Sequence, residues 1–191
     1  SAPTSKGIFN AIKTTYNFIS GSFDLKRIHV AISGVGKVGG KLAILLFKAG
    51  VNITVASINQ DTINQLKKKI SLVEVSPENL FKTKCDIISP CALGAAINKS
   101  NRKQLKCAAI VGAANNQLDK SETSEWLLKN NILYSPDYLV NSGGVIAIAC
   151  EINGTQKMLD DNLIKISKRL KTVLEESIKN NESTDTVATR M

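Results

Sequence analysis

The sequence alternates between short apolar runs and longer stretches in which apolar residues recur every three or four positions. A short run bounded by turn residues is typical of a buried strand, and the wider spacing is typical of one face of a helix. The runs that predict strands cover residues 28–33, 51–58, 72–75, 85–89, 107–111 and 132–134. Because the stretches between them predict crossover helices, the pattern indicates an α/β fold built on a doubly wound, mostly parallel sheet.

Helical spacing also marks both ends of the chain. Residues 4–20 predict an N-terminal helix that Gly21 ends. A long C-terminal helix is expected over residues 159–174, and the polar residues 180–186 after it predict a loop. Further helices are expected at residues 41–49, 63–66, 121–129 and 145–150. Since neither a repeat nor a linker composition divides the sequence, residues 1–191 are expected to form a single domain.

The stretch with the clearest chemical meaning is Gly-Val-Gly-Lys-Val-Gly at residues 34–39, between a predicted strand and a predicted helix. A helix N-terminus carries partial positive charge and unpaired amide hydrogens, and glycines let a phosphate approach them. In that arrangement Gly34 permits the tight turn, Gly36 the approach of a pyrophosphate, and Gly39 the packing of helix on strand. The pattern also occurs in plain turns, but its place between strand and helix favours a Rossmann-like dinucleotide-binding domain.

The charge distribution favours a small phosphate-bearing ligand over nucleic acid. The formal net charge is +9, and residues 1–50 carry seven Lys or Arg but only one acidic residue, Asp24. This excess surrounds the glycine stretch and would attract a dinucleotide. The basic triplet at residues 67–69 ends a predicted helix and has no interleaved aromatic residues. A solvated helix end explains that triplet better than a nucleic-acid site does.

Membrane and metal-binding classes find little support in the sequence. The apolar runs are too short to span a bilayer and the N-terminus has no signal pattern, so no membrane partner and a cytoplasmic location are expected. The four cysteines form no Cys-x-x-Cys pair and His29 is the one histidine, so no metal is expected and the cysteines are predicted to be reduced. Because His29 falls within a predicted strand, we interpret it as a strand residue and not as a catalytic base.

Three further segments follow the fourth, fifth and sixth predicted strands, at the edge where such sheets bind ligands. They are Cys-Asp-Ile-Ile-Ser-Pro-Cys-Ala-Leu-Gly at residues 85–94, Gly-Ala-Ala-Asn-Asn-Gln-Leu at 112–118, and Ser-Pro-Asp-Tyr-Leu-Val-Asn-Ser-Gly-Gly-Val at 135–145. In this order they resemble the C-terminal nucleotide-binding domain of the Glu/Leu/Phe/Val amino-acid dehydrogenase family, and within it the leucine dehydrogenases. The resemblance runs from about residue 3 to the end of the chain.

The resemblance implies where a nicotinamide dinucleotide lies. Residues 34–40 match the family's pyrophosphate loop, and Cys91 and Ala92 match the segment that passes the cofactor riboses. Asn115 and Asn141 match asparagines near the nicotinamide ring. The complete set of cofactor-binding residues predicted in this way is Thr4, Gly34, Gly36, Lys37, Val38, Gly39, Ser57, Ile58, Cys91, Ala92, Asn115 and Asn141.

The resemblance also implies how the ring and the substrate are held. Thr4 matches a threonine near the nicotinamide amide, and Val145 and Ile148 match positions that shape the substrate side-chain pocket. Aliphatic walls of this kind select an aliphatic side chain. Gly143 and Gly144 precede them, and their spacing leaves two interpretations open: a plain turn, or a turn that opens a helix N-terminus toward a ligand.

One position departs from the family pattern. Relatives that use NAD end the second strand with an aspartate that accepts hydrogen bonds from the adenine ribose, and Ser57 occupies this position. Serine does not repel a 2′-phosphate, but neither Ile58 nor Asn59 supplies a cation to bind one. NAD is therefore the expected cofactor and NADP the alternative.

The family's catalytic lysines and aspartate belong to a domain that precedes the matched one, so no catalytic residue is expected in this chain. The resemblance implies reversible oxidative deamination of an aliphatic L-amino acid to its 2-oxo acid by a homo-oligomeric enzyme. The chain, as an isolated domain or an unusually short relative, is expected to bind nucleotide without turnover. One alternative is a catalytically silent nucleotide-binding or regulatory module. Another is a glutamate or phenylalanine dehydrogenase-type enzyme, although Val145 and Ile148 offer no cation for a glutamate side chain.

Overall fold

A parallel sheet organises the molecule, and the computed structural model describes residues 2–92 and 94–191. The strands are β1 (His29–Ser33), β2 (Asn52–Ala56), β3 (Val73–Glu74), β4 (Ile87–Pro90), β5 (Ala109–Ile110) and β6 (Leu133–Tyr134). Within the described residues they form one six-stranded sheet in the order β3-β2-β1-β4-β5-β6. All of these pairings are parallel, so the carboxyl ends of the strands meet at one edge. This arrangement confirms the predicted α/β class and its doubly wound, mostly parallel sheet.

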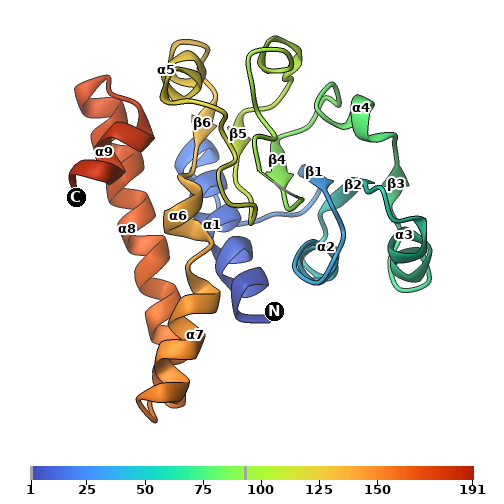
Figure 1. Ribbon diagram of the computed structural model, residues 1–191, viewed down its shortest axis with the longest axis horizontal. Coiled ribbons are helices and arrows are strands. Elements are labelled where there is room, and N and C mark those ends of the chain that lie inside the picture. The colour runs from blue at the N-terminus through green and yellow to red at the C-terminus, as the bar shows by residue number, and fades with distance from the viewer. Residues whose placement is uncertain (1, 93) are drawn as a thin grey trace.

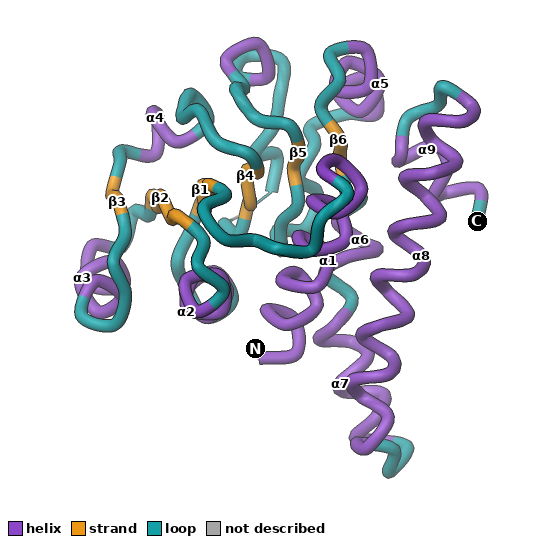
Figure 2. The backbone as a smooth tube through the Cα atoms, turned by 180° about the vertical axis from the view of Figure 1, so that it is seen from behind, coloured by secondary structure: helices purple, strands orange, loops and turns teal. Residues whose placement is uncertain are grey.

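Helices cover both faces of the sheet and one of its ends. They are α1 (Ala2–Ser20), α2 (Gly39–Lys48), α3 (Gln60–Lys67), α4 (Pro77–Leu80), α5 (Ser121–Lys129), α6 (Asp137–Val140), α7 (Gly143–Ile152), α8 (Leu159–Asn180) and α9 (Thr184–Arg190), with short 3-10 helices η1 (Arg102–Gln104) and η2 (Gln156–Met158). Figure 1 shows α2 and α3 on one side of the row of strands and α4 and α5 on the other. From behind, in Figure 2, α8 and α9 stand beside β6. Across residues 2–92 and 94–191, no helix combines the length and the apolar character needed to span a membrane.

Alternation along β1 divides the core between the two faces of the sheet. Val30 and Ile32 belong to a buried cluster that includes Leu46 of α2 and extends to α1 and α8. Ala31 belongs instead to a cluster on the opposite face with Leu80 of α4. Because both faces are covered, the central strands are buried on both sides, which accounts for the continuous apolar runs in the sequence.

The end of the chain differs from the prediction that residues 180–186 form a loop. After α8, Asn181 adopts a left-handed backbone conformation with φ of 52°, and α9 begins at Thr184. Ser183 caps α9, because its Oγ accepts the N–H of Thr186 at 3.3 Å. Residues 181–183 do form a short connection, but the loop prediction was wrong for residues 180 and 184–186, which are helical. The polar residues here end one helix and cap the next, which composition alone does not distinguish from a longer loop.

The histidine and the cysteines occupy structural positions. His29 Nε2 lies 2.8 Å from Thr54 Oγ1 on the neighbouring strand, as expected of a strand residue. The cysteines that form no disulfide are Cys85, Cys91, Cys107 and Cys150. Burial raises the pKa of Cys85 and of Cys107 to about 12, so both thiols keep their protons at neutral pH.

Candidate functional site

The predicted residues of the glycine stretch and those that follow β4 lie at the carboxyl edge of the sheet, around the β1–β4 pair. There the chain continues from β1 into the glycine stretch and from β4 into Cys91 and Ala92. The strand order changes direction at this pair, because β2 and β3 extend the sheet from β1 while β5 and β6 extend it from β4. In doubly wound sheets, ligands bind outside the carboxyl ends at such a switch point.

Two glycines allow the strand, the turn and α2 to come together. Gly34 has a φ of +86°, and its N–H donates to the carbonyl oxygen of Ala56 at 2.7 Å. A Cβ at Gly34 would lie 2.8 Å from the Cβ of Ala92, and a Cβ at Gly39 would lie 3.0 Å from the Cβ of Cys91. The segments that follow β1 and β4 are therefore in contact, and any larger residue at either glycine would force them apart.

Gly36 differs from these two glycines because it faces open space. A Cβ built there would meet no heavy atom within 4 Å, and both Gly36 and Lys37 are exposed. Val38, at the N-cap position of α2, has no side-chain oxygen for the first-turn N–H groups, and this turn carries no acidic residue. The turn and the helix start thus form an open, positively polarised cradle whose shape and charge fit a phosphate pair.

The cradle is anchored from α1 by a buried hydroxyl. Ser5 is fully buried, and its Oγ donates to the carbonyl oxygen of Val38 at 3.0 Å. This bond ties the first turn of α1, which carries Thr4, to the start of α2. Sequence reasoning missed Ser5, because one serine within an amphipathic helix shows no chemical pattern.

The end of β4 supplies the neighbouring wall of the site. The N–H of Cys91 donates to the carbonyl oxygen of Ser33 at 2.7 Å. Burial raises the pKa of the Cys91 thiol, which makes it a protonated, small apolar wall and not a nucleophile. Gly112, after β5, packs against the same strand end, since a Cβ there would lie 2.2 Å from the carbonyl oxygen of Pro90.

The two predicted asparagines meet although 26 positions separate them. Asn141 Nδ2 donates to Asn115 Oδ1 at 2.6 Å. Gly94 packs against the same turn, since a Cβ there would lie 2.5 Å from the carbonyl oxygen of Asn115. Within residues 2–92 and 94–191, neither Asn115 Nδ2 nor Asn141 Oδ1 has a further hydrogen-bond partner. The pair therefore retains a donor group, the NH₂ of Asn115, and an acceptor group, the side-chain oxygen of Asn141, and a carboxamide requires both kinds of group.

The first turns of α1 and α7 touch through a glycine pair. A Cβ at Gly143 would lie 2.8 Å from the carbonyl oxygen of Pro3, and a Cβ at Gly144 would lie 3.0 Å from Thr4 Oγ1. Both glycines are the first residues of α7, so they serve the close packing of two helices. The sequence spacing of Gly143 and Gly144 is compatible both with a plain turn and with a turn that opens a helix N-terminus toward a ligand. The packing brings Thr4 next to the segment that carries Asn141.

The end of β2 lies beside the glycine stretch but carries no charge of its own. The bond from Gly34 to Ala56 brings the residue that follows, Ser57, next to the turn. Ser57 is half-buried, and its Oγ accepts the N–H of Asn59 at 3.3 Å. Ile58 is 97% exposed. The geometry therefore places both predicted residues at the site edge without assigning them a preference between a ribose hydroxyl and a phosphate.

The two predicted substrate-pocket residues stand on an exposed face of α7. Val145 is 71% exposed and Ile148 is 59% exposed, and Ile152, one turn further along, is 78% exposed. The structure thus aligns them as an apolar stripe that begins close to Asn141. It does not enclose them in a cavity.

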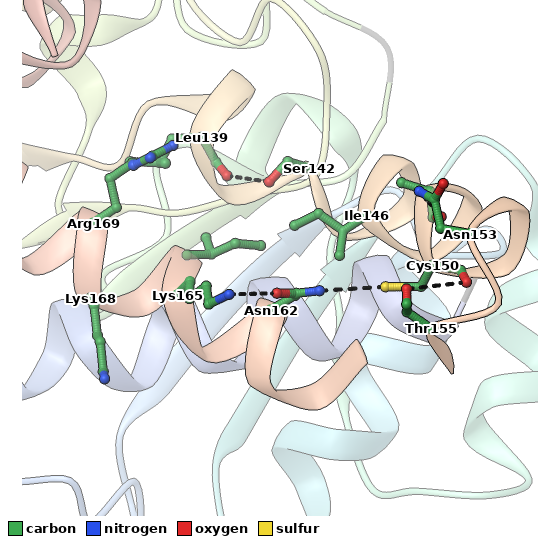
Figure 3. Close-up of a pocket in the computed structure, with 12 residues that line it drawn as sticks. Leu139, Ser142, Ile146, Cys150, Asn153, Thr155, Asn162, Lys165, Lys168 and Arg169 are labelled. Carbon is green, nitrogen blue, oxygen red and sulfur yellow. Dashed lines mark hydrogen bonds between the residues drawn. The ribbon is translucent and has the colours of Figure 1, made fainter. Parts of the chain in front are cut away.

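A separate groove of about 550 Å³ borders a different face of α7, between α7 and α8 (Figure 3). Figure 3 shows Lys165, Asn162 and Cys150 in a row, in which Lys165 Nζ donates to Asn162 Oδ1 at 2.9 Å and Asn162 Nδ2 to Cys150 Sγ at 3.5 Å. None of the predicted cofactor or substrate residues lines this groove. It is therefore distinct from the edge that carries the glycine cradle.

Sequence reasoning also gave no role to two buried polar residues near the asparagine pair. Gln117 is fully buried and Asp137 is 6% exposed. The N–H of Gln117 donates to Asp137 Oδ2 at 2.7 Å. The available signal was an acidic residue within the mostly apolar segment 132–140, where a buried carboxylate needs hydrogen-bond donors.

Comparison with known proteins finds similarity to amino-acid dehydrogenases over nearly the whole chain. A family model described as Glutamate/Leucine/Phenylalanine/Valine dehydrogenase matches residues 1–188. The phenylalanine dehydrogenase of Thermoactinomyces intermedius is 43% identical over 158 residues, which cover 81% of this chain and 43% of that protein. The leucine dehydrogenase of Bacillus subtilis (strain 168) is 36% identical over 151 residues, which cover 79% of this chain and 42% of that protein.

A solved structure agrees with these sequence matches. The crystal structure of L-tryptophan dehydrogenase from Nostoc punctiforme has a TM-score of 0.96 and 32% identity to this chain, and the match covers 100% of this chain and 57% of that one. The chain spans less than half the length of the two curated relatives. On the family model, the sequence identity and the shared fold, the chain belongs to the Glutamate/Leucine/Phenylalanine/Valine dehydrogenase family.

Proposed function

We propose that this chain is the nucleotide-binding part of an NAD(P)-dependent amino-acid dehydrogenase. The observation that supports it best is the gathering, at one sheet edge, of an open glycine cradle and a bonded asparagine pair. Gly36 and the first turn of α2 would hold the pyrophosphate. Asn115 and Asn141 would hold the nicotinamide carboxamide through their remaining donor and acceptor, with Thr4 beside them. When bound, the nicotinamide supplies hydride chemistry, and the chain binds and orients it.

We propose an L-amino acid with an apolar side chain as the substrate of the whole enzyme, with the 2-oxo acid as the product. Val145 and Ile148 present apolar side chains at the start of α7 and offer no cation for a side-chain carboxylate, which disfavours glutamate. An aliphatic substrate such as leucine suits these two residues. An aromatic substrate has equal support, because the similar proteins include phenylalanine and tryptophan dehydrogenases.

For the cofactor we propose NAD, with NADP as the alternative. Ser57 can share a hydrogen bond with the adenine ribose, whereas Ile58 and Asn59 bring no positive charge for a 2′-phosphate. No residue of this chain is assigned to proton transfer, so the chain alone should bind nucleotide without turnover. Homo-oligomeric assembly and a cytoplasmic location stay predictions from the sequence.

Titration of the purified chain with NADH, NADPH and ADP-ribose tests this proposal. Binding of any of them should raise the melting temperature, because a ligand at about 100 times its Kd stabilises the folded state by about 2.7 kcal/mol. Calorimetry then gives the affinities. If none of the three ligands binds, the proposed function is wrong. Reduction of NAD or NADP by this chain with leucine or phenylalanine would contradict the expectation that it has no turnover.

A further inference from the structure

Asp137 begins α6 as a buried carboxylate that accepts two backbone hydrogen bonds. Its Oδ2 accepts the N–H of Gln117 at 2.7 Å, and its Oδ1 accepts the N–H of Tyr138 at 2.6 Å. The residue is only 6% exposed. A buried carboxylate is tolerated when each oxygen has a donor, and both bonds are short, as charge-assisted bonds are.

The same residue is bonded to both segments that carry the asparagine pair. On the β5 side it holds Gln117, two residues after Asn115, and Gln117 Nε2 donates to the carbonyl oxygen of Ala114 at 3.0 Å. These two bonds close the turn on which Asn115 stands. On the β6 side, the carbonyl oxygen of Asp137 accepts the N–H of Asn141 at 2.9 Å. Asp137 is thus a direct link between the backbones of the two asparagine-bearing segments.

We propose that Asp137 is a positioning residue that sets the spacing of Asn115 and Asn141 and thereby the affinity with which they bind the nicotinamide carboxamide. This inference rests on the proposed dinucleotide function. Asp137 does not itself touch the ligand in this scheme. It acts through the Asn141–Asn115 bond, whose 2.6 Å length depends on both backbones being held in place.

The chemistry of the site explains why an acid is needed there. Only a carboxylate offers an acceptor on both oxygens, whereas the asparagine amide would turn an NH₂ group toward one of the two N–H donors. Tyr134 completes the arrangement, because its phenol oxygen accepts the N–H of Asp137 at 3.2 Å. Burial, followed by the nearby charge of Asp137, raises the pKa of Tyr134, so the phenol stays neutral and no second negative charge forms beside the carboxylate.

The test compares ligands that differ only in the nicotinamide riboside part. Calorimetric Kd values for NAD and for ADP-ribose are measured on the wild-type chain and on Asp137→Asn, or for NADP and 2′-phospho-ADP-ribose if the wild-type chain prefers NADP. We expect Asp137→Asn to weaken dinucleotide binding about tenfold or more while ADP-ribose binding changes less than about twofold. A purely structural role would weaken both ligands alike.

Asp119→Asn is the matched control. Asp119 lies two residues after Gln117 and bonds Thr123 Oγ1 at 2.6 Å, so the variant makes the same chemical change in the same segment without touching the asparagine pair. It should leave the ratio of the two affinities unchanged. Adding Asn141→Ala to Asp137→Asn should cause little further loss, because both changes act on one interaction.

The outcomes separate this inference from the proposed function. If the wild-type chain binds none of these ligands, the proposed function itself fails. If the wild-type chain binds ADP-ribose and NAD equally, or if Asp137→Asn keeps the wild-type ratio, the positioning role is wrong while nucleotide binding stands. Should Asp137→Asn not fold, Tyr134→Phe removes only the acceptor of the Asp137 N–H. Like Asp137→Asn, it should lower the affinity for NAD relative to the affinity for ADP-ribose, and an unchanged ratio of these two affinities would refute the inference.

Discussion

Asn141 Nδ2 and Asn115 Oδ1 lie 2.6 Å apart, and their hydrogen bond joins the segments that follow β6 and β5. The bond is possible because β5 and β6 are parallel neighbours, so their carboxyl ends emerge side by side. The side-chain amides of Asn115 and Asn141 therefore lie next to each other although the two residues are distant in the sequence. The pair offers a donor and an acceptor from fixed positions, as recognition of a planar carboxamide requires.

Removing one member of this pair should weaken nicotinamide binding selectively. We expect Asn141→Ala to reduce NAD affinity about tenfold, which corresponds to about 1.4 kcal/mol, and to leave ADP-ribose affinity unchanged. In a double-mutant cycle with Asn115→Ala, the double variant should lose less NAD-binding free energy than the sum of the losses in the two single variants, because each substitution breaks the same bond. Asn153→Ala, which removes an exposed amide bonded to the carbonyl oxygen of Ala149, is the control and should change neither affinity. Equal losses for NAD and ADP-ribose would contradict the assignment.

The glycine stretch predicts opposite results for two alanine substitutions. Gly34→Ala places a side chain at φ of +86° and 2.8 Å from the Cβ of Ala92, so it should lower the free energy of unfolding by about 2 kcal/mol or more. Gly36→Ala meets no atom within 4 Å, so it should leave that free energy unchanged or raise it by up to about 1 kcal/mol. Its added methyl group should nevertheless weaken NADH binding about tenfold or more. Urea unfolding and calorimetry measure the two quantities.

Either substitution can disprove its part of this assignment. Tight NADH binding by Gly36→Ala would show that the pyrophosphate does not approach Gly36. A fully stable Gly34→Ala would show that the turn has room to relax around Ala92.

Apolar periodicity was sufficient to predict the sheet, because the central strands are covered on both faces. Val30, Ala31 and Ile32 are all fully buried, which makes β1 a continuous apolar run. Strand ends were less predictable, because a strand ends where its neighbour stops pairing. Residues 51–58 were predicted as one strand, yet β2 ends at Ala56, opposite the last residue of β1. The four-residue helices α4 and α6 are too short to show a helical period.

The candidate site was predictable where a residue type has a local meaning and not where it acts through distant contacts. The glycine turn follows β1 directly, and the two asparagines lie in the segments after β5 and β6, so the parallel topology brings these segments to one edge of the sheet. Ser5 bonds Val38 and Asp137 bonds Gln117, and the residues next to them in the sequence do not indicate these partners. An acidic residue in an apolar segment, as at Asp137, suggests that hydrogen-bond partners exist, but only the fold shows which backbone groups those partners are.

Two half-buried thiols, those of Cys85 and Cys107, predict how the free energy of unfolding depends on alkaline pH. Burial raises the pKa of Cys85 and of Cys107 from 9.0 to about 12, so the folded chain holds these protons more tightly than the unfolded chain does. Their contribution is complete below about pH 9 and is lost as the pH rises toward 12, by up to about 1.4 kcal/mol per thiol per pH unit.

Urea unfolding between pH 8 and about pH 10.5 measures this effect. The matched comparison is the double variant Cys85→Ala, Cys107→Ala, which keeps the lysine and tyrosine titrations and lacks only the thiols. Its free energy of unfolding should fall less steeply with pH than that of the wild-type chain. Parallel curves for the two proteins would show that these thiols do not titrate differently on folding.

Ser57, the residue that follows β2, is expected to influence the choice between NADH and NADPH. Its Oγ accepts the N–H of Asn59 beside the glycine stretch, where an adenine ribose would lie. Ser57→Asp adds a carboxylate that can bond a 2′-hydroxyl but repels a 2′-phosphate, so NADPH affinity should fall at least about tenfold while NADH affinity stays constant or rises. Asn59→Asp is the matched control, because it adds the same charge two residues away and keeps the oxygen that caps α3 by accepting the N–H of Thr62. If both variants shift the NADH to NADPH affinity ratio equally, the effect is a general charge effect. A selective shift from Ser57→Asp places the cofactor's 2′ position at Ser57.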